Sequence, residues 1–115
     1  MIIDPDILPL ISDLNEAGYV TWQSCSGDSP NHPKPLTPSR RTRAAWVAFT
    51  DLKEEMLTEN IREELDGIIK AHTNVPYILK GAKRKRSPQE AKLRSKWHIP
   101  MLWAKVNIIF DGPIS

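Results

Sequence analysis

The chain has 115 residues, and we expect one domain over residues 1–115. A hydrophobic share of 40%, a charged share of 26% and a net charge of +2 are typical of a globular protein without an overall basic field. No apolar run has the roughly 18–20 residues that span a bilayer, so we expect no membrane partner. The single cysteine cannot form an internal disulfide, which favours a cytoplasmic location.

Charge is unevenly distributed along the chain. Half of the acidic residues lie within residues 51–66, and half of the basic residues lie within residues 80–96. The chain is therefore electrically polar, and the basic segment could meet the phosphates of a nucleotide or of RNA.

Residues 4–17 are predicted to form a helix that is capped by Asp4 or Asp6. Its apolar residues recur at helical spacing: Ile7, Leu10, Ile11 and Leu14. Residues 19–25 are rich in β-branched and aromatic side chains, which predicts a strand. A long connection over residues 26–43, rich in Pro and Ser, follows this strand, and we expect it to be partly mobile.

The apolar residues 44–49 are predicted to form a second strand, antiparallel to residues 19–25. This pairing would bring Arg43 close to Cys25, where the guanidinium could lower the pKa of the thiol. Residues 51–72 are predicted to form one long helix that Asp51 caps, with Glu54 as its capping-box acid. The stripe that this helix buries would be Leu57, Ile61, Leu65, Ile68 and His72.

The remaining elements complete a small sheet. Residues 75–80 are predicted to form a strand that Pro76 delays or places at an edge. Within the basic connection over residues 81–100, Ser87 and Pro88 indicate the start of a short helix that ends near Lys96. Alternating residues over 102–110 predict the last strand.

This order predicts an α+β fold with a small four-stranded, mostly antiparallel sheet and helices packed on one face. The opposite face of the sheet would then be free for a second copy of the chain. We therefore expect a homo-oligomer.

The first candidate site is the polar turn at the end of the first predicted strand. Hydroxyls, backbone amides and a flexible glycine can bind phosphate, and arginine forks match phosphate oxygens. The alternatives are an ordinary polar turn, a buried structural thiol and a solvated arginine loop. The candidate ligand-binding residues are Ser24, Cys25, Ser26, Gly27, His32, Arg40, Arg41 and Arg43.

The second candidate site is the basic segment with its neighbouring aromatic residue. Cations beside an aromatic ring can hold single-stranded nucleic acid by charge and stacking, although a solvated connection gives the same pattern. The candidate residues are Lys83, Arg84, Lys85, Arg86 and Trp97. We expect no metal, because one cysteine and three scattered histidines do not form a ligand set. No catalytic residue can be assigned.

Residues 7–49 resemble the start of the tRNA wybutosine-synthesising protein 3 family. The resemblance rests on Tyr19, Val20 and Thr21, on the Ser-Cys-Ser-Gly run that starts at Ser24, and on the later strand around Trp46. It implies a methyltransferase that modifies a guanosine of tRNA with S-adenosylmethionine. The chain differs from that family at Asp28, where an arginine is usual.

Three functions are compatible with these patterns. The first, which we favour, is a small binding protein for a nucleotide-like or nucleic-acid ligand, without a cofactor and without chemistry. The second is a methyltransferase-like RNA-modifying enzyme that uses S-adenosylmethionine. The third is an oligomeric interaction protein without a small ligand.

Overall fold

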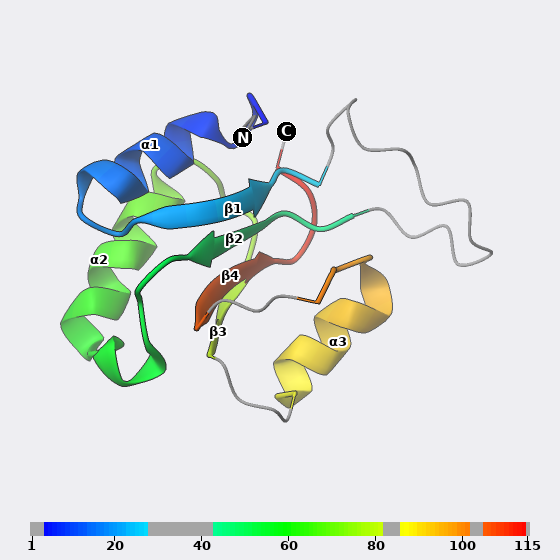
Figure 1. Ribbon diagram of the computed structural model, residues 1–115. Coiled ribbons are helices and arrows are strands. Elements are labelled where there is room, and N and C mark those ends of the chain that lie inside the picture. The colour runs from blue at the N-terminus through cyan, green and yellow to red at the C-terminus, as the bar shows by residue number, and fades with distance from the viewer. Residues whose placement is uncertain (1–3, 28–42, 82–85, 102–104, 115) are drawn as a thin grey trace.

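The computed structural model describes residues 4–27, 43–81, 86–101 and 105–114 (Figure 1). Its elements in chain order are the helix α1 (Leu8–Glu16), the strands β1 (Thr21–Cys25) and β2 (Trp46–Phe49), the 3-10 turn η1 (Glu54–Met56), the helix α2 (Glu59–Lys70), the strand β3 (Tyr77–Gly81), the helix α3 (Pro88–Lys96) and the strand β4 (Val106–Phe110).

The four strands form one sheet in the order β1-β2-β4-β3, and every neighbouring pair is antiparallel. This confirms the predicted α+β class and the predicted pairing of the first two strands. All five residues of the central strand β4 are buried, because both faces of the sheet are covered there. The strand β3 begins after Pro76 and lies at an edge, as the proline predicted.

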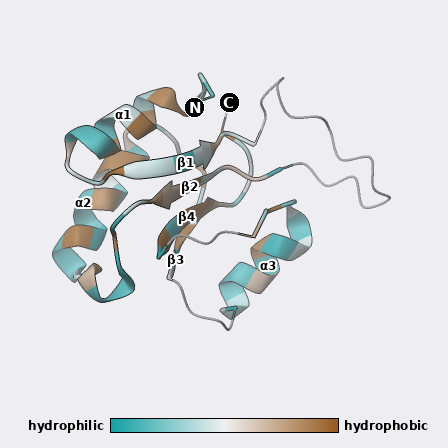
Figure 2. Cartoon of the chain, viewed as in Figure 1, coloured by the Kyte–Doolittle hydropathy of each residue, from teal (hydrophilic) through white to brown (hydrophobic). Residues whose placement is uncertain are grey.

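Helices cover both faces of the sheet rather than one. The helices α1 and α2 bury Leu14 and Leu65 against Phe49 and Ile108 on the first face. On the second face, a smaller cluster includes Leu93 of α3 and Ile109 of β4, the neighbour of Ile108. The expectation of helices on one face therefore holds for α1 and α2 only (Figure 1). In Figure 2 the hydrophobic colour appears on β2 and β4 and in bands on α1 and α2, whereas α3 is mostly hydrophilic.

The predicted N-terminal helix is confirmed, but its predicted cap is wrong. Ile7 occupies the cap position of α1, and no side chain caps the helix. The carbonyl oxygen of Asp4 accepts hydrogen bonds from the amides of Ile7 and Leu8, at 3.1 Å each. The carboxylate of Asp4 is used elsewhere, in the turn described below.

The predicted long helix over residues 51–72 is wrong at its start, whereas its end at Lys70 lies within two residues of the expected one. Residues 54–56 form only a 3-10 turn, and α2 begins after Thr58, whose hydroxyl accepts a hydrogen bond from the amide of Ile61 at 3.3 Å. A better cap within the same window thus replaces Asp51, and Leu52 is buried in the core. His72 lies beyond α2, with its Nε2 atom 2.5 Å from a carboxylate oxygen of Asp13 on α1.

Candidate functional site

The turn of residues 24–27 ends β1 and packs against the start of β2. Cys25 is 3% exposed and Ser26 is fully buried, whereas Ser24 is half-buried. Gly27 has a φ of +83°, and a Cβ atom there would lie 2.4 Å from the carbonyl oxygen of Arg43. Only glycine fits this backbone conformation and this close approach without strain.

The hydrogen-bond donors of this turn face a carboxylate of the protein itself. The amide and the hydroxyl of Ser26 donate to Oδ2 of Asp4 at 3.0 and 3.2 Å. The amide of Ile114, which follows β4, donates to the carbonyl oxygen of Ser26 at 2.8 Å. Asp4 therefore occupies the position where the sequence suggested a bound phosphate, and the buried turn joins three segments of the fold.

The thiol of Cys25 is not activated. Burial is the largest effect and raises the pKa of this thiol; the Gly27 amide lowers the pKa, the Asp4 carboxylate raises it and Arg43 lowers it. The predicted proximity of Arg43 is confirmed, and its guanidinium does lower the pKa of Cys25, but desolvation outweighs this effect and the net shift is upward. A neutral buried thiol is a poor nucleophile.

Arg43 connects this region to α3. It forms a parallel bridge with His98, just after α3, and the amide of Ala44 donates to the carbonyl oxygen of His98 at 3.3 Å. The Nε atom of Arg43 is buried, and no described residue accepts a hydrogen bond from it. The other predicted members of this site, His32, Arg40 and Arg41, lie outside the described residues.

Exposed cations lie on α3 and just before it, and we call Arg86, Lys92 and Lys96 the α3 surface. All three are exposed, although Lys96 also lies 3.5 Å from a carboxylate oxygen of Asp111. The one acid of α3, Glu90, is 2% exposed and pairs with Lys80 at 3.1 Å and with Arg94 at 2.9 Å. The helix therefore buries its negative charge and exposes positive charge. Lys83, Arg84 and Lys85 lie outside the described residues.

Trp97 has a structural environment. Its indole N–H donates to a carboxylate oxygen of Asp111 at 2.7 Å, and its ring packs on the second-face cluster with Leu93 and Ile109. A Cβ atom at Gly112 would lie 3.3 Å from this ring. These contacts hold the half-buried ring in place beside the α3 surface.

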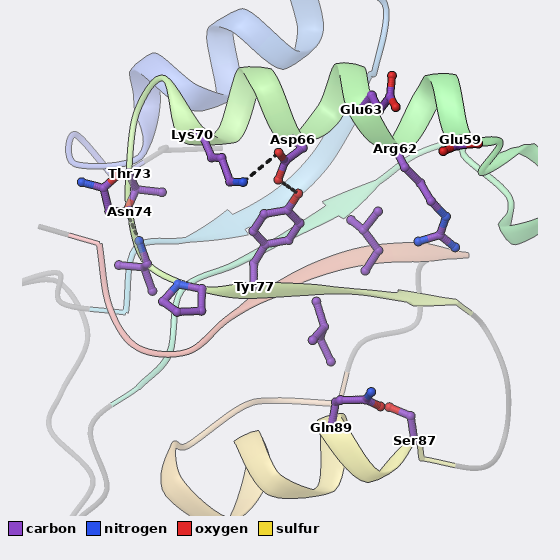
Figure 3. A pocket seen from close by; sticks show the side chains of 14 residues that line it. Glu59, Arg62, Glu63, Asp66, Lys70, Thr73, Asn74, Tyr77, Ser87 and Gln89 are labelled. Atoms are coloured by element: carbon purple, nitrogen blue, oxygen red, sulfur yellow. Dashed lines mark hydrogen bonds and ion pairs between the residues drawn. The ribbon is translucent and has the colours of Figure 1, made fainter.

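A groove that the sequence did not predict runs between α2 and the edge strand β3. Its volume is about 940 Å³. Inside it, the Tyr77 hydroxyl donates to one Asp66 oxygen at 2.6 Å, and Lys70 Nζ lies 3.0 Å from the other (Figure 3). The only signals in the sequence were Pro76, which indicated an edge strand, and the helical spacing of Asp66 and Lys70.

This hydrogen-bond network shifts the pKa values of Asp66 and Tyr77 in opposite directions. The hydrogen bond from Tyr77, together with that from Lys70, lowers the pKa of Asp66. Burial and the nearby Asp66 carboxylate raise the pKa of Tyr77 well above its ordinary range. Tyr77 therefore stays a hydrogen-bond donor at neutral pH, and Asp66 stays ionised.

The part of the chain that the structure describes contains no group of three His, Cys, Asp or Glu side chains that could hold a metal ion. None of its helices combines the length and the apolar character that crossing a bilayer requires.

Comparison with known proteins gives no relative. No family model, no curated protein and no solved structure matches this chain. The resemblance to the tRNA wybutosine-synthesising protein 3 family therefore stays a prediction, and the chain is not assigned to a family.

Proposed function

We propose that this protein binds single-stranded nucleic acid and catalyses no reaction. The α3 surface and the adjoining Arg43 would contact the phosphates of the nucleic acid. The observation that carries the proposal is the bridge between Arg43 and His98. It brings the end of one arginine-rich segment, residues 40–43, next to the end of the basic segment that contains α3. Arg43 and the residue two positions after α3 are thus neighbours in the fold, although they are far apart in the sequence.

The distribution of buried and exposed charges around α3 supports binding at the same surface. Glu90, the one acid of α3, is buried in ion pairs with Lys80 and Arg94. Lys92 on α3 and Arg86 just before it are exposed to solvent. The acidic helix α2 covers the opposite face of the sheet (Figure 1). A polyanion that approaches α3 therefore meets positive charge first.

The 24–27 turn has a supporting role in this proposal. Its buried donors hold Asp4, and its glycine allows the close approach that positions the backbone of Arg43. The raised pKa of Cys25 argues against a thiolate mechanism. A cytoplasmic location, inferred from the single cysteine, is part of the proposal.

Fluorescence anisotropy with a labelled oligouridine of twelve nucleotides tests the proposal. We expect Lys92→Glu to weaken binding roughly fivefold or more at low salt, and to flatten the salt dependence, because a phosphate contact is lost. The matched control is Lys53→Glu, an equal charge change at an exposed residue outside α3.

An equal loss of affinity in both variants would mean that only the net charge of the protein matters, and it would contradict binding at the α3 surface. A native mass spectrum of the same preparation provides a second readout. Added mass equal to S-adenosylmethionine would instead favour the methyltransferase-like function, and it would count against a binding protein without chemistry.

A further inference from the structure

The edge strand β3 leaves part of its backbone without a partner strand. The amide of Asp111 donates to the carbonyl oxygen of Pro76 at 2.7 Å, and the register places Ile78 opposite Ile109 and Lys80 opposite Asn107. In an antiparallel ladder, bonded and non-bonded pairs alternate. The amides and carbonyls of Tyr77 and Leu79 therefore point away from β4.

These outward backbone groups lie along the groove described above. Figure 3 shows β3 between α2 on one side, with Arg62, Glu63 and Asp66, and α3 on the other, with Ser87 and Gln89. No described residue outside the sheet forms a backbone hydrogen bond with Tyr77 or Leu79. The groove is thus a channel beside an open strand edge.

The opposite edge of the sheet is covered at Thr21. The amide of Thr21 in β1 donates to Oδ1 of Asn15 at 3.1 Å, and Nδ2 of Asn15 lies 3.0 Å from the Thr21 hydroxyl. A register irregularity between Thr21 and Gln23 further interrupts β1. Side-chain cover and bulges are the usual protection against strand addition, and the described part of β3 shows neither at Tyr77 and Leu79.

We propose that this groove binds an extended, positively charged peptide segment of a partner protein, which adds as a strand beside β3. An occupant must offer alternating amides and carbonyls to Tyr77 and Leu79, and an extended peptide does so. The α2 side of the groove carries three carboxylates against two cations: Glu59, Glu63 and Asp66 against Arg62 and Lys70. This balance favours lysine or arginine side chains in the peptide.

The carboxylates also argue against a second copy of the chain in this groove. Antiparallel pairing of two β3 edges about a two-fold axis keeps equivalent faces of the two sheets on the same side. It would therefore place α2 of one copy beside α2 of the other, with their acidic side chains adjacent. A foreign basic strand avoids this repulsion.

The groove has a defined end. A Cβ atom at Gly81 would lie 2.5 Å from Oε2 of Glu54, so this side chain covers the last residue of β3. The open stretch spans Tyr77 to Leu79, and a short peptide is enough to fill it. We therefore use a six-residue peptide as the probe.

Amide hydrogen exchange on the full chain, followed by NMR, tests the proposal with acetyl-(Lys-Val)₃-amide. We expect the peptide to slow exchange at Tyr77 and Leu79 at least tenfold. Ile78 and Lys80, bonded to β4, should be slow with and without peptide. Glu63→Lys should weaken peptide binding at least threefold, whereas Glu55→Lys, outside the groove, should not.

Two control peptides separate backbone pairing from charge attraction. A peptide with N-methyl groups on alternate amides keeps the charge but loses the donors, and it should give no protection. The Glu-Val analogue should bind more weakly. Unchanged exchange with millimolar Lys-Val peptide would overturn the proposal. Concentration-dependent protection of Tyr77 and Leu79 without peptide would overturn it in favour of a second copy.

Discussion

The 24–27 turn and the groove beside β3 are both polar, but one is filled by the protein itself and the other is open. In the turn, Asp4 accepts from the amide and the hydroxyl of Ser26, which is fully buried. In the groove, the outward amides and carbonyls of Tyr77 and Leu79 have no backbone hydrogen-bond partner among the described residues. Polar residue types alone do not tell whether such groups are hydrogen-bonded within the protein or left open, because this depends on which distant segment of the chain packs beside them.

The largest expected effect on stability is that of Gly27→Ala, which disrupts the packing of the 24–27 turn. The new Cβ atom would lie 2.4 Å from the backbone oxygen of Arg43, at a φ of +83°. We expect a loss of about 3 kcal/mol or more in the free energy of unfolding, since the neighbour is backbone and cannot move aside. Denaturant unfolding measures this loss.

Gly18→Ala is the matched control for that variant. Gly18 also has a positive φ, of +97°, but a Cβ atom there meets nothing within 4 Å. We expect a cost of about 1 kcal/mol from backbone strain alone. Equal costs at the two glycines would show that close packing at the turn contributes nothing.

Glu90→Gln tests the anchoring of β3 from the side opposite α2. The Arg94 and Lys80 partners lower the pKa of Glu90 despite its burial. Because the folded pKa is below the unfolded one, this carboxylate stabilises the fold above about pH 4.5, and the benefit is lost as pH falls through the folded pKa. We expect the variant to lose about 2–3 kcal/mol at neutral pH.

The pH dependence provides the check on that prediction. The stability difference between wild type and Glu90→Gln should shrink as urea unfolding is measured at decreasing pH below 4.5. A difference that stays constant with pH would mean that packing, rather than charge, sets the cost. Exposed Glu55→Gln serves as the control and should change little.

Asp4→Ala tests whether the hydrogen bonds between Ser26 and the Asp4 carboxylate stabilise the turn. The substitution leaves the buried amide and hydroxyl of Ser26 without their acceptor. We expect a loss of about 2 kcal/mol, the usual cost of unsatisfied buried donors. Asp4→Asn, which keeps one carbonyl acceptor, should lose less. If both variants are as stable as wild type in thermal unfolding, the bond to Asp4 is dispensable.

The smallest expected effect is that of Tyr77→Phe in the open groove. The fold should be retained, and the pKa of Asp66 should rise toward its ordinary value, because the Tyr77 hydrogen bond is the largest cause of its lowering. Carbon-13 NMR titration of the Asp66 carboxyl measures this change. Tyr19→Phe is the control and should leave the pKa of Asp66 where it is. An unchanged Asp66 pKa in Tyr77→Phe would assign the lowering to Lys70.

Local signals predicted several elements well. Ser87 and Pro88 marked the start of α3, and Pro76 marked both the late start and the edge position of β3. These signals act within a few residues, so they are readable from the chain alone. The start of α2 was missed because Asp51 and Thr58 are both suitable caps, and burial of Leu52 favours the later one.

The candidate sites show the limit of such signals. The sequence marked the 24–27 turn by its residue types and placed Arg43 near Cys25 through strand pairing. It contained no sign that Asp4 would reach Ser26, or that Glu90 would be withdrawn between Lys80 and Arg94. It also did not show that α2 and α3 would flank an open strand edge.

Periodicity, caps and turn residues thus predicted the α+β class and the antiparallel pairing of β1 and β2. The residue types alone gave the uneven distribution of charge along the chain. These properties depend on neighbours in sequence or on one hydrophobic pattern. Tertiary structure alone decided which polar groups are satisfied internally and which remain open to a partner. The reason is physical: hydrogen bonding and desolvation of a group depend on atoms contributed by segments far away in the chain.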